Sequence, residues 1–146
     1  MKICQIETKL FNVLSEFYKI TDFDKIKEEE LIALCYLIEW KSFIETGTSI
    51  LNLPETWKVG LNGAEPDKHS RIEILNAWER VKYYKNKTSS ALTLEEIEWI
   101  DHISKIFMKC SYTEFFLTVK STHPMLKVEY LESFNIKEMA KEYKGK

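Results

Sequence analysis

The sequence predicts a mainly α-helical fold: a single compact domain, residues 1–146, of about six helices around a buried central helix. Three observations predict it. Apolar residues recur at helical spacing through most of the chain. One stretch, residues 31–38, is apolar on every side. Helix-capping patterns mark the last third of the chain. A chain of 146 residues has single-domain length and can bury about 70% of its unfolded surface.

The first two helices are predicted from their apolar patterns. Residues 3–20, within an amino-terminal unit of residues 1–24, have one apolar and one polar face, as in a helix packed on one side. The second helix is predicted from about Lys25 to Thr46, ending at Gly47. It contains LIALCYLI, residues 31–38. A helix that is apolar all round is buried from every direction, so we place it at the centre of the fold.

A small hairpin or ordered loop is predicted near residues 48–66. The stretch LNLPETWKVGLNGAEP, residues 51–66, holds two of the four glycines and two of the three prolines, which are turn formers. It contains neither GxGxxG nor GxxxxGK, which argues against a phosphate-binding loop. Pro66 suits the first turn of a third helix, predicted over residues 66–84.

Three capping patterns define helices in the carboxyl-terminal third. In each, a capping side chain and a glutamate three residues later satisfy each other's free backbone amides. The pairs are Thr93 with Glu96, Ser111 with Glu114, and Asn135 with Glu138. We therefore expect helices to begin near residues 94, 112 and 136, the last of them a capped helix over 135–144.

Composition and charge narrow the classes of function. The chain has 21 basic and 23 acidic residues, a formal net charge of −2, and so lacks the basic footprint of a duplex-binding protein. A helix-turn-helix over residues 93–120 would present Glu114 to a DNA groove instead of Arg or Lys. These features argue against nucleic acid as the partner.

Cysteine usage and the apolar runs bear on the compartment. Cys4, Cys35 and Cys110 are odd in number, far apart and in no CxxC pair, which fits the reduced thiols of a cytoplasm. The longest apolar run, residues 31–38, is too short to cross a bilayer. We expect a cytoplasmic protein with no membrane association.

No motif of catalysis or metal binding is present. His69, His102 and His123 are far apart in the sequence, and HExxH, HxxxH, GxSxG and Cys/His clusters do not occur. His102 is expected on the solvent side of its helix and His123 in a loop. The acidic run 28–30 falls near the positive end of the second helix, where carboxylates are favoured without any metal. We expect no enzymatic activity, no cofactor and no metal.

A partner-binding surface is predicted from aromatic side chains that are hard to bury together. Exposed Trp and Tyr next to Arg dominate binding hot spots, although single exposed apolar side chains are also normal. We expect Trp57 to be exposed on the turn-rich segment, near the outer face of the third helix. The predicted surface consists of Trp57, Lys58, His69, Ile72, Asn76, Arg80 and Tyr83.

The order of features from residue 29 to 124 resembles the Panacea domain, a SocA-like antitoxin family also known from phage-associated proteins. The family has an apolar helix with a tyrosine-leucine step, a glycine turn, a Trp- and Gly/Pro-bearing loop that enters a helix, and two capped helices. Here these read LIALCYLIEW (31–40), ETGTSI (45–50), TWKVGLNGAEP (56–66), LTLEEIEWID (92–101) and CSYTEFFLTVKSTHP (110–124). FNIKEMAKEYK (134–144) is weakly similar to the tail of some members.

The resemblance covers about two thirds of the chain and departs from the family at two points. Ala64 and Glu65 separate Gly63 from Pro66, where the family has adjacent Gly and Pro. The lysines common before the tyrosine-leucine step are missing.

The resemblance implies a Panacea-like core over about 25–124 and a function in protein binding. Such a domain is a non-enzymatic antitoxin that binds a cognate toxin protein and neutralises it by direct contact, or in some members delivers it to a protease. Two alternatives stay open: a phage-encoded inhibitor of a host defence protein or host enzyme, and a DNA-binding regulator. The expected partner is a protein, and a homodimer is left open.

Overall fold

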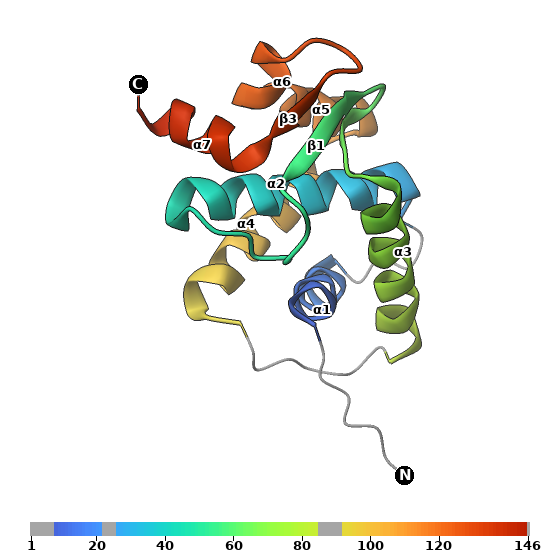
Figure 1. Cartoon of the computed structure of the whole chain (residues 1–146). Helices are drawn as coiled ribbons and strands as arrows, with labels where there is room; N and C mark the ends of the chain where they lie inside the picture. Colours follow the sequence, from blue (N-terminus) through green and yellow to red (C-terminus); the bar gives the residue numbers. More distant parts are fainter. Residues whose placement is uncertain (1–7, 22–25, 85–91, 146) are drawn as a thin grey trace.

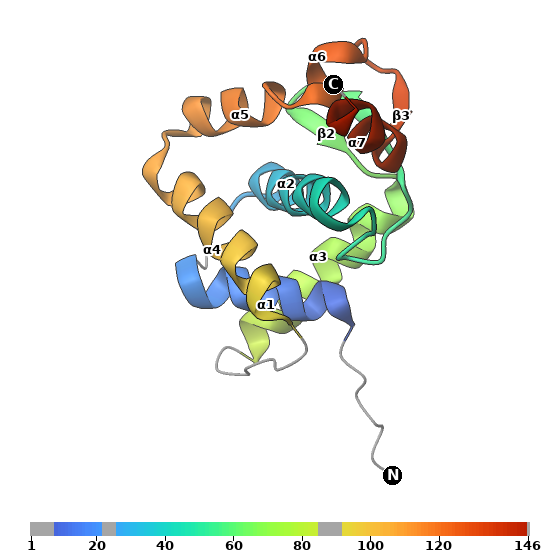
Figure 2. The same cartoon turned by 90° about the vertical axis from the view of Figure 1, so that its left-hand side faces the viewer.

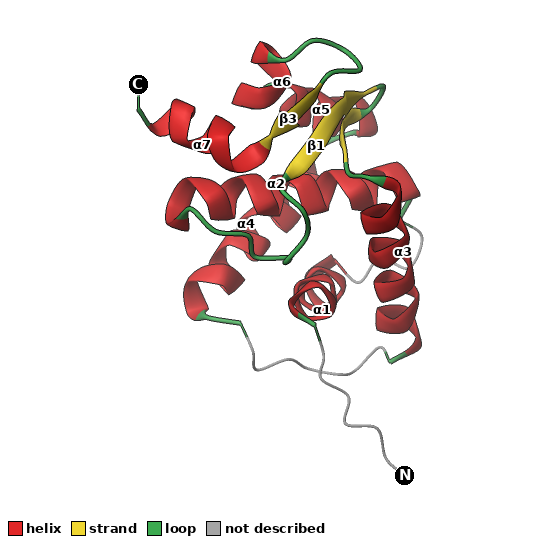
Figure 3. Ribbon diagram, viewed as in Figure 1, coloured by secondary structure: helices red, strands yellow, loops and turns green. Residues whose placement is uncertain are grey.

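The computed structural model of this chain describes residues 8–21, 26–84 and 92–145. In these ranges it contains seven helices and a three-stranded sheet (Figures 1 and 3), so the prediction of a mainly helical fold is confirmed. The elements are α1 (Lys9–Thr21), α2 (Glu28–Thr46), β1 (Thr56–Gly60), β2 (Gly63–Glu65), α3 (Lys68–Tyr83), α4 (Leu94–Lys109), α5 (Tyr112–Lys120), α6 (His123–Lys127), β3 (Ser133–Asn135) and α7 (Ile136–Lys144).

The central helix of the fold is α2, as predicted. Figure 2 shows it in the middle of the molecule, with α1, α3, α4, α5 and α7 arranged around it. Every residue from Leu31 to Trp40 is buried. The helix ends at Gly47, which has φ +78° and donates its amide to the carbonyl of Phe43. Glycine adopts this left-handed conformation without a Cβ clash, which explains why α2 stops there.

The predicted hairpin is formed by β1 and β2, and β3 completes an antiparallel sheet in the order β2-β1-β3. Val59 lies opposite Ala64, and Trp57 opposite Phe134. The sheet lies on the same side of α2 as α7 (Figure 1). The sequence did not predict β3 because a strand of three residues is too short to show an alternating pattern.

The helix boundaries confirm the three capping predictions and correct the predicted start of the third helix. Thr93, Ser111 and Asn135 each accept a hydrogen bond from the backbone amide three residues later, and their helices begin at residues 94, 112 and 136. The third helix starts later than predicted, at Lys68, because the Asp67 carboxylate caps it by accepting the amide of Ser70 at 2.7 Å. Pro66 therefore precedes the helix.

One further expectation differs from the structure, and another is only partly covered by the described residues. His123 lies in the short helix α6, which was not predicted and which has Pro124 in its first turn; the expected loop is absent there. The predicted first helix is observed from Lys9 onward, and residues 1–7 lie outside the described ranges. Leu14 and Phe17 of α1 are buried, and the helix packs against α3 and α4 (Figure 2).

A strained leucine precedes β3. Leu131 has φ +72°, a region that disfavours side chains with a Cβ. The amide of Glu132 donates to the carbonyl of Glu129 at 3.0 Å and closes a turn. Val59 of β1 accepts from the amide of Leu131 and donates to the carbonyl of Glu132. Two residues thus face one, which is a β-bulge of the kind that usually takes glycine.

Leu131→Gly is expected to raise the free energy of unfolding by about 1 kcal/mol, because glycine adopts this backbone conformation without strain. The Leu131 side chain is 58% exposed, so little burial is lost. Urea denaturation followed by circular dichroism measures the change. As a control, Leu126→Gly replaces another exposed leucine inside the helix α6 and is expected to destabilise. A loss of stability for Leu131→Gly would contradict the bulge.

Candidate protein-binding surface on α3

The helix α3 buries one side and exposes the other. Its buried side runs from Ser70 to Val81 and includes Trp78. With 100° between successive residues, five residues of the exposed side fall within a sector of roughly 80°, which the exposed Glu73 and Glu79 flank on either side. We call this sector the α3 face; it consists of His69, Ile72, Asn76, Arg80 and Tyr83. All of these residues are exposed, as the sequence predicted.

The end of the α3 face carries an aromatic pair. Tyr83 is 80% exposed, and the ring of Tyr84 meets it edge to face with 4.8 Å between ring centres. Tyr84 is the residue that ends the helix and is itself exposed. Sequence reasoning missed it because Tyr84 falls after the last helical turn, where the periodicity no longer assigns a face.

The predicted exposure of Trp57 is wrong. Its side chain is 1% exposed and packs edge to face against Tyr36 of α2, with 5.6 Å between ring centres. The physical reason is the alternation of side chains along β1, which turns Trp57 toward α2 and the next residue outward. Lys58 is accordingly exposed, and it lines a pocket of about 240 Å³ together with Glu65, Asp67 and Lys68, the first residue of α3.

Arg80 is held on the α3 face by stacking. Its guanidinium carbon lies 4.9 Å from the ring centre of Phe11 in α1, a cation–π contact. Within residues 8–21, 26–84 and 92–145, no carboxylate forms an ion pair with it. His69, by contrast, lies 3.7 Å from the carboxylate of Glu73.

A groove of about 610 Å³ runs beside the α3 face. Three segments form it: the start of α1, the loop 51–53 and α3. Its apolar lining consists of Leu10, Leu51, Leu53 and Ala77, and its polar lining of Thr8, Lys9, Asn52, Glu73, Asn76 and Arg80. We call it the α1–α3 groove. No local pattern predicts this groove, because its walls are 20 or more residues apart along the chain.

A buried carboxylate positions one wall of the α1–α3 groove. Glu39 of α2 accepts the backbone amides of Ile50 at 2.9 Å and Leu51 at 3.1 Å. It also accepts the hydroxyl of Ser49, whose oxygen in turn accepts the amide of Asn52 at 2.8 Å. Burial raises the pKa of Glu39, and these hydrogen bonds oppose the rise. Glu39 therefore fixes the loop against the central helix.

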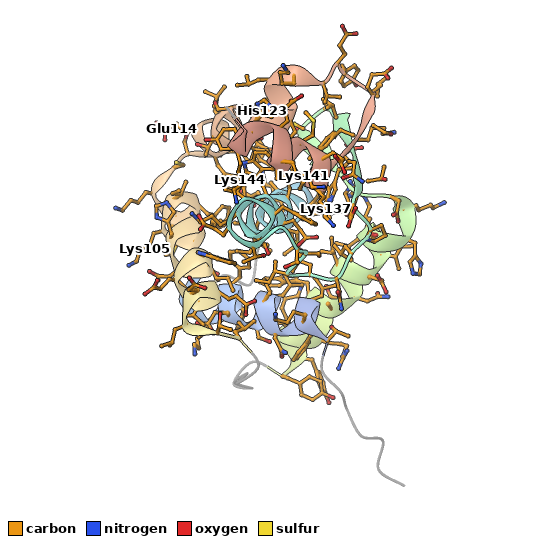
Figure 4. All side chains as sticks on the ribbon, turned by 60° about the vertical axis from the view of Figure 1, so that its left-hand side comes forward. Lys105, Glu114, His123, Lys137, Lys141 and Lys144 are labelled. Carbon is orange, nitrogen blue, oxygen red and sulfur yellow. The ribbon has the colours of Figure 1, made fainter. Side chains whose placement is uncertain are left out.

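The histidines and cysteines do not converge on a common site. His69, His102 and His123 belong to α3, α4 and α6, and His102 is exposed as predicted. His123, labelled in Figure 4, is buried at the contact of α6 with α7. Its Nε2 lies 2.7 Å from Oε1 of Glu142. Among the described residues, no group of three or more His, Cys, Asp or Glu side chains could hold a metal ion.

Cys35 behaves as a small core residue, as expected. It is fully buried in α2. Burial raises the pKa of its thiol, so the thiol stays protonated and unreactive. Cys110 is partly buried, and Cys4 lies outside the described residues.

Comparisons of the chain with protein-family models, curated proteins and solved structures find no match. The resemblance to the Panacea domain therefore rests on the residues quoted above. In the ranges that the structure covers, none of the helices combines the length and the apolar character needed to cross a bilayer.

Proposed function

We propose that this chain is an antitoxin-type protein that binds a cognate toxin protein through the α3 face and neutralises it by direct contact. The single observation that carries the proposal is the composition of that face. Tyr83, Arg80 and Ile72 are exposed together on a helix whose other side is core. Tyrosine and arginine are residue types that dominate protein-binding hot spots.

The support behind the α3 face also favours binding. On the opposite side of the helix, Ile74 is fully buried, and Trp78 packs edge to face against Tyr18 of α1 at 5.7 Å. Arg80 is stacked on Phe11. Side chains on such a fixed helix lose less conformational freedom on binding than those on a mobile loop.

The resemblance to the Panacea domain favours a toxin as the partner. The inhibitor of a host protein is the second candidate; it would use the same face, and the partner's identity separates the two. The DNA-binding alternative has weaker support. Glu114, labelled in Figure 4, lies in the first turn of α5. Its carboxylate accepts the amide of Ser111 at 2.8 Å, and the chain carries a net charge of −2. An acidic first turn opposes approach to phosphate.

Tyr83→Ala is expected to weaken toxin binding by about 2 kcal/mol, roughly 30-fold, while the thermal midpoint stays unchanged. The reason is that Tyr83 is 80% exposed and contributes little to the core. The partner to use is the protein encoded by the adjacent gene, provided that it arrests growth when expressed alone. Isothermal titration calorimetry measures the affinity.

Leu126→Ala is the matched control, since Leu126 is 71% exposed on α6, at the other end of the molecule (Figure 1). It is expected to bind the toxin as the wild type does. Full affinity of both Tyr83→Ala and Ile72→Ala would show that the α3 face is not the binding surface. An adjacent gene product without toxicity would favour the host-directed inhibitor.

A further inference from the structure

We propose that the α1–α3 groove binds an extended polypeptide segment that carries a carboxylate next to an apolar side chain. The inference deepens the proposed function and rests on it in one respect, namely that the occupant belongs to a protein partner. Three features of the groove carry the inference: its apolar lining, and the amide side chains and the guanidinium that have no polar partner among the described residues.

The apolar lining supplies a place for one side chain of the segment. Leu10, Leu51, Leu53 and Ala77 come from three different parts of the chain and meet in the groove. Its volume of about 610 Å³ falls within the range of about 300–1,000 Å³ typical of ligand sites. Burying an aliphatic side chain against such a surface is favourable because it removes apolar area from water.

The amides of Asn52 and Asn76 suit a polypeptide backbone. In the part of the chain that the structure describes, neither side-chain amide has a hydrogen-bond partner, and both residues are exposed at the groove. An asparagine amide donates and accepts at once, as a peptide group does. An extended segment that enters the groove loses water from its backbone and needs such partners.

The charge of the groove selects a carboxylate. Three charged side chains line it. Lys9 is paired with Glu96 at 3.0 Å, whereas Glu73 lies 3.7 Å from His69, which compensates its charge only when the imidazole is protonated. Arg80 has no carboxylate partner among the described residues. Its planar fork of N–H donors matches the two oxygens of a carboxylate.

The groove is also formed in advance of binding. Glu39 holds the backbone of Ile50 and Leu51, and through Ser49 it holds Asn52. Arg80 is kept in place by Phe11. A segment that binds therefore orders few groups of this protein, which reduces the entropic penalty of binding.

The test is an NMR titration of the ¹⁵N-labelled full chain with N-acetyl-leucine, which carries one carboxylate and one apolar side chain. We expect shifts of the side-chain amide signals of Asn52 and Asn76 and of the Arg80 Nε–H. N-acetyl-leucinamide has the same side chain without the charge. Its affinity is expected to be lower than that of N-acetyl-leucine by a factor of about ten or more.

Arg80→Met keeps an unbranched side chain but removes the guanidinium, and it is expected to weaken N-acetyl-leucine binding by about tenfold, leaving the affinity for the amide unchanged. Lys82→Met is the matched control, because Lys82 is a cation of the same helix that pairs with Glu79 and does not line the groove. It is expected to bind both probes as the wild type does.

Four results with the probes would overturn the inference. They are no shifts at any soluble concentration of N-acetyl-leucine, shifts confined to residues outside the groove, equal affinity for acid and amide, and equal affinity of Arg80→Met and wild type. Shifts that follow protein concentration in the absence of probe would assign the groove to a second copy of this chain and also overturn it. If Tyr83→Ala loses toxin binding and no probe binds to the groove, the proposed peptide site in the groove is refuted while the proposed function stands. If the probes bind as expected but no protein partner of this chain is found, the proposed antitoxin function is refuted while the groove's preference for a carboxylate stands.

Discussion

Trp57→Ala is expected to lower the free energy of unfolding by about 3–5 kcal/mol, the usual effect of truncating a buried tryptophan. Trp57 is 1% exposed, faces Tyr36 of the central helix, and lies opposite Phe134 in the sheet. Removing its ring therefore leaves a cavity where α2 and the sheet meet. Urea denaturation followed by circular dichroism measures the loss.

Two further variants isolate the reason for this effect. Trp57→Phe keeps an aromatic ring and removes an indole N–H that has no hydrogen-bond partner among the described residues, so it is expected to destabilise far less. Lys58→Ala, at the adjacent exposed position, is expected to change stability by less than about 0.5 kcal/mol. If Trp57→Ala kept wild-type stability but failed to bind the partner, the burial of Trp57 would be contradicted and Trp57 would instead be an exposed binding residue.

Replacing Glu39 is expected to have the second large effect. Glu39→Ala should lower the free energy of unfolding by about 3 kcal/mol, because it leaves the buried amides of Ile50 and Leu51 without an acceptor. Glu39→Gln keeps one acceptor oxygen in the same place and is expected to destabilise less than Glu39→Ala. The same urea titration separates the two variants.

The two Glu39 variants also differ in their dependence on pH. Burial raises the pKa of Glu39 in the folded protein above the ordinary value of about 4.5, which applies to the unfolded chain. At pH values above about 4.5, Glu39 is therefore more protonated in the folded state than in the unfolded state. The contribution of Glu39 to stability is therefore greatest below that pH and declines as pH rises through the folded pKa. Glu39→Gln lacks this decline.

The measurement compares the free energies of unfolding of wild type and Glu39→Gln at intervals between about pH 4 and pH 8. We expect the difference between the two proteins to move in favour of Glu39→Gln as pH rises. A difference that is constant, or that moves in favour of the wild type, would contradict a raised pKa at this carboxyl.

The parts of the fold that could be predicted from the sequence depend on short-range interactions. The caps at Thr93, Ser111 and Asn135 and the stop at Gly47 involve residues within four positions of one another. The α3 face follows from helical periodicity alone, since the buried side of α3 determines what lies opposite.

The parts that could not be predicted depend on residues far apart along the chain. β3 pairs with β1 across more than 70 residues, as Trp57 and Phe134 illustrate. Glu39 binds amides 11 and 12 residues later, and no local pattern distinguishes it from a solvated glutamate. Trp57 was misplaced for the same reason: its neighbours are turn formers, whereas its burial depends on Tyr36.

Hydroxyl-radical footprinting of the complex with the partner tests most directly whether this protein acts through the α3 face. The method measures the exposure of individual side chains. Tyr83 on α3 and Tyr130 in the turn before β3 are both exposed, so Tyr130 serves as an internal control. We predict that the oxidation rate of Tyr83 falls severalfold on binding, while that of Tyr130 is unchanged. Protection of Tyr130 with Tyr83 unchanged would contradict the account.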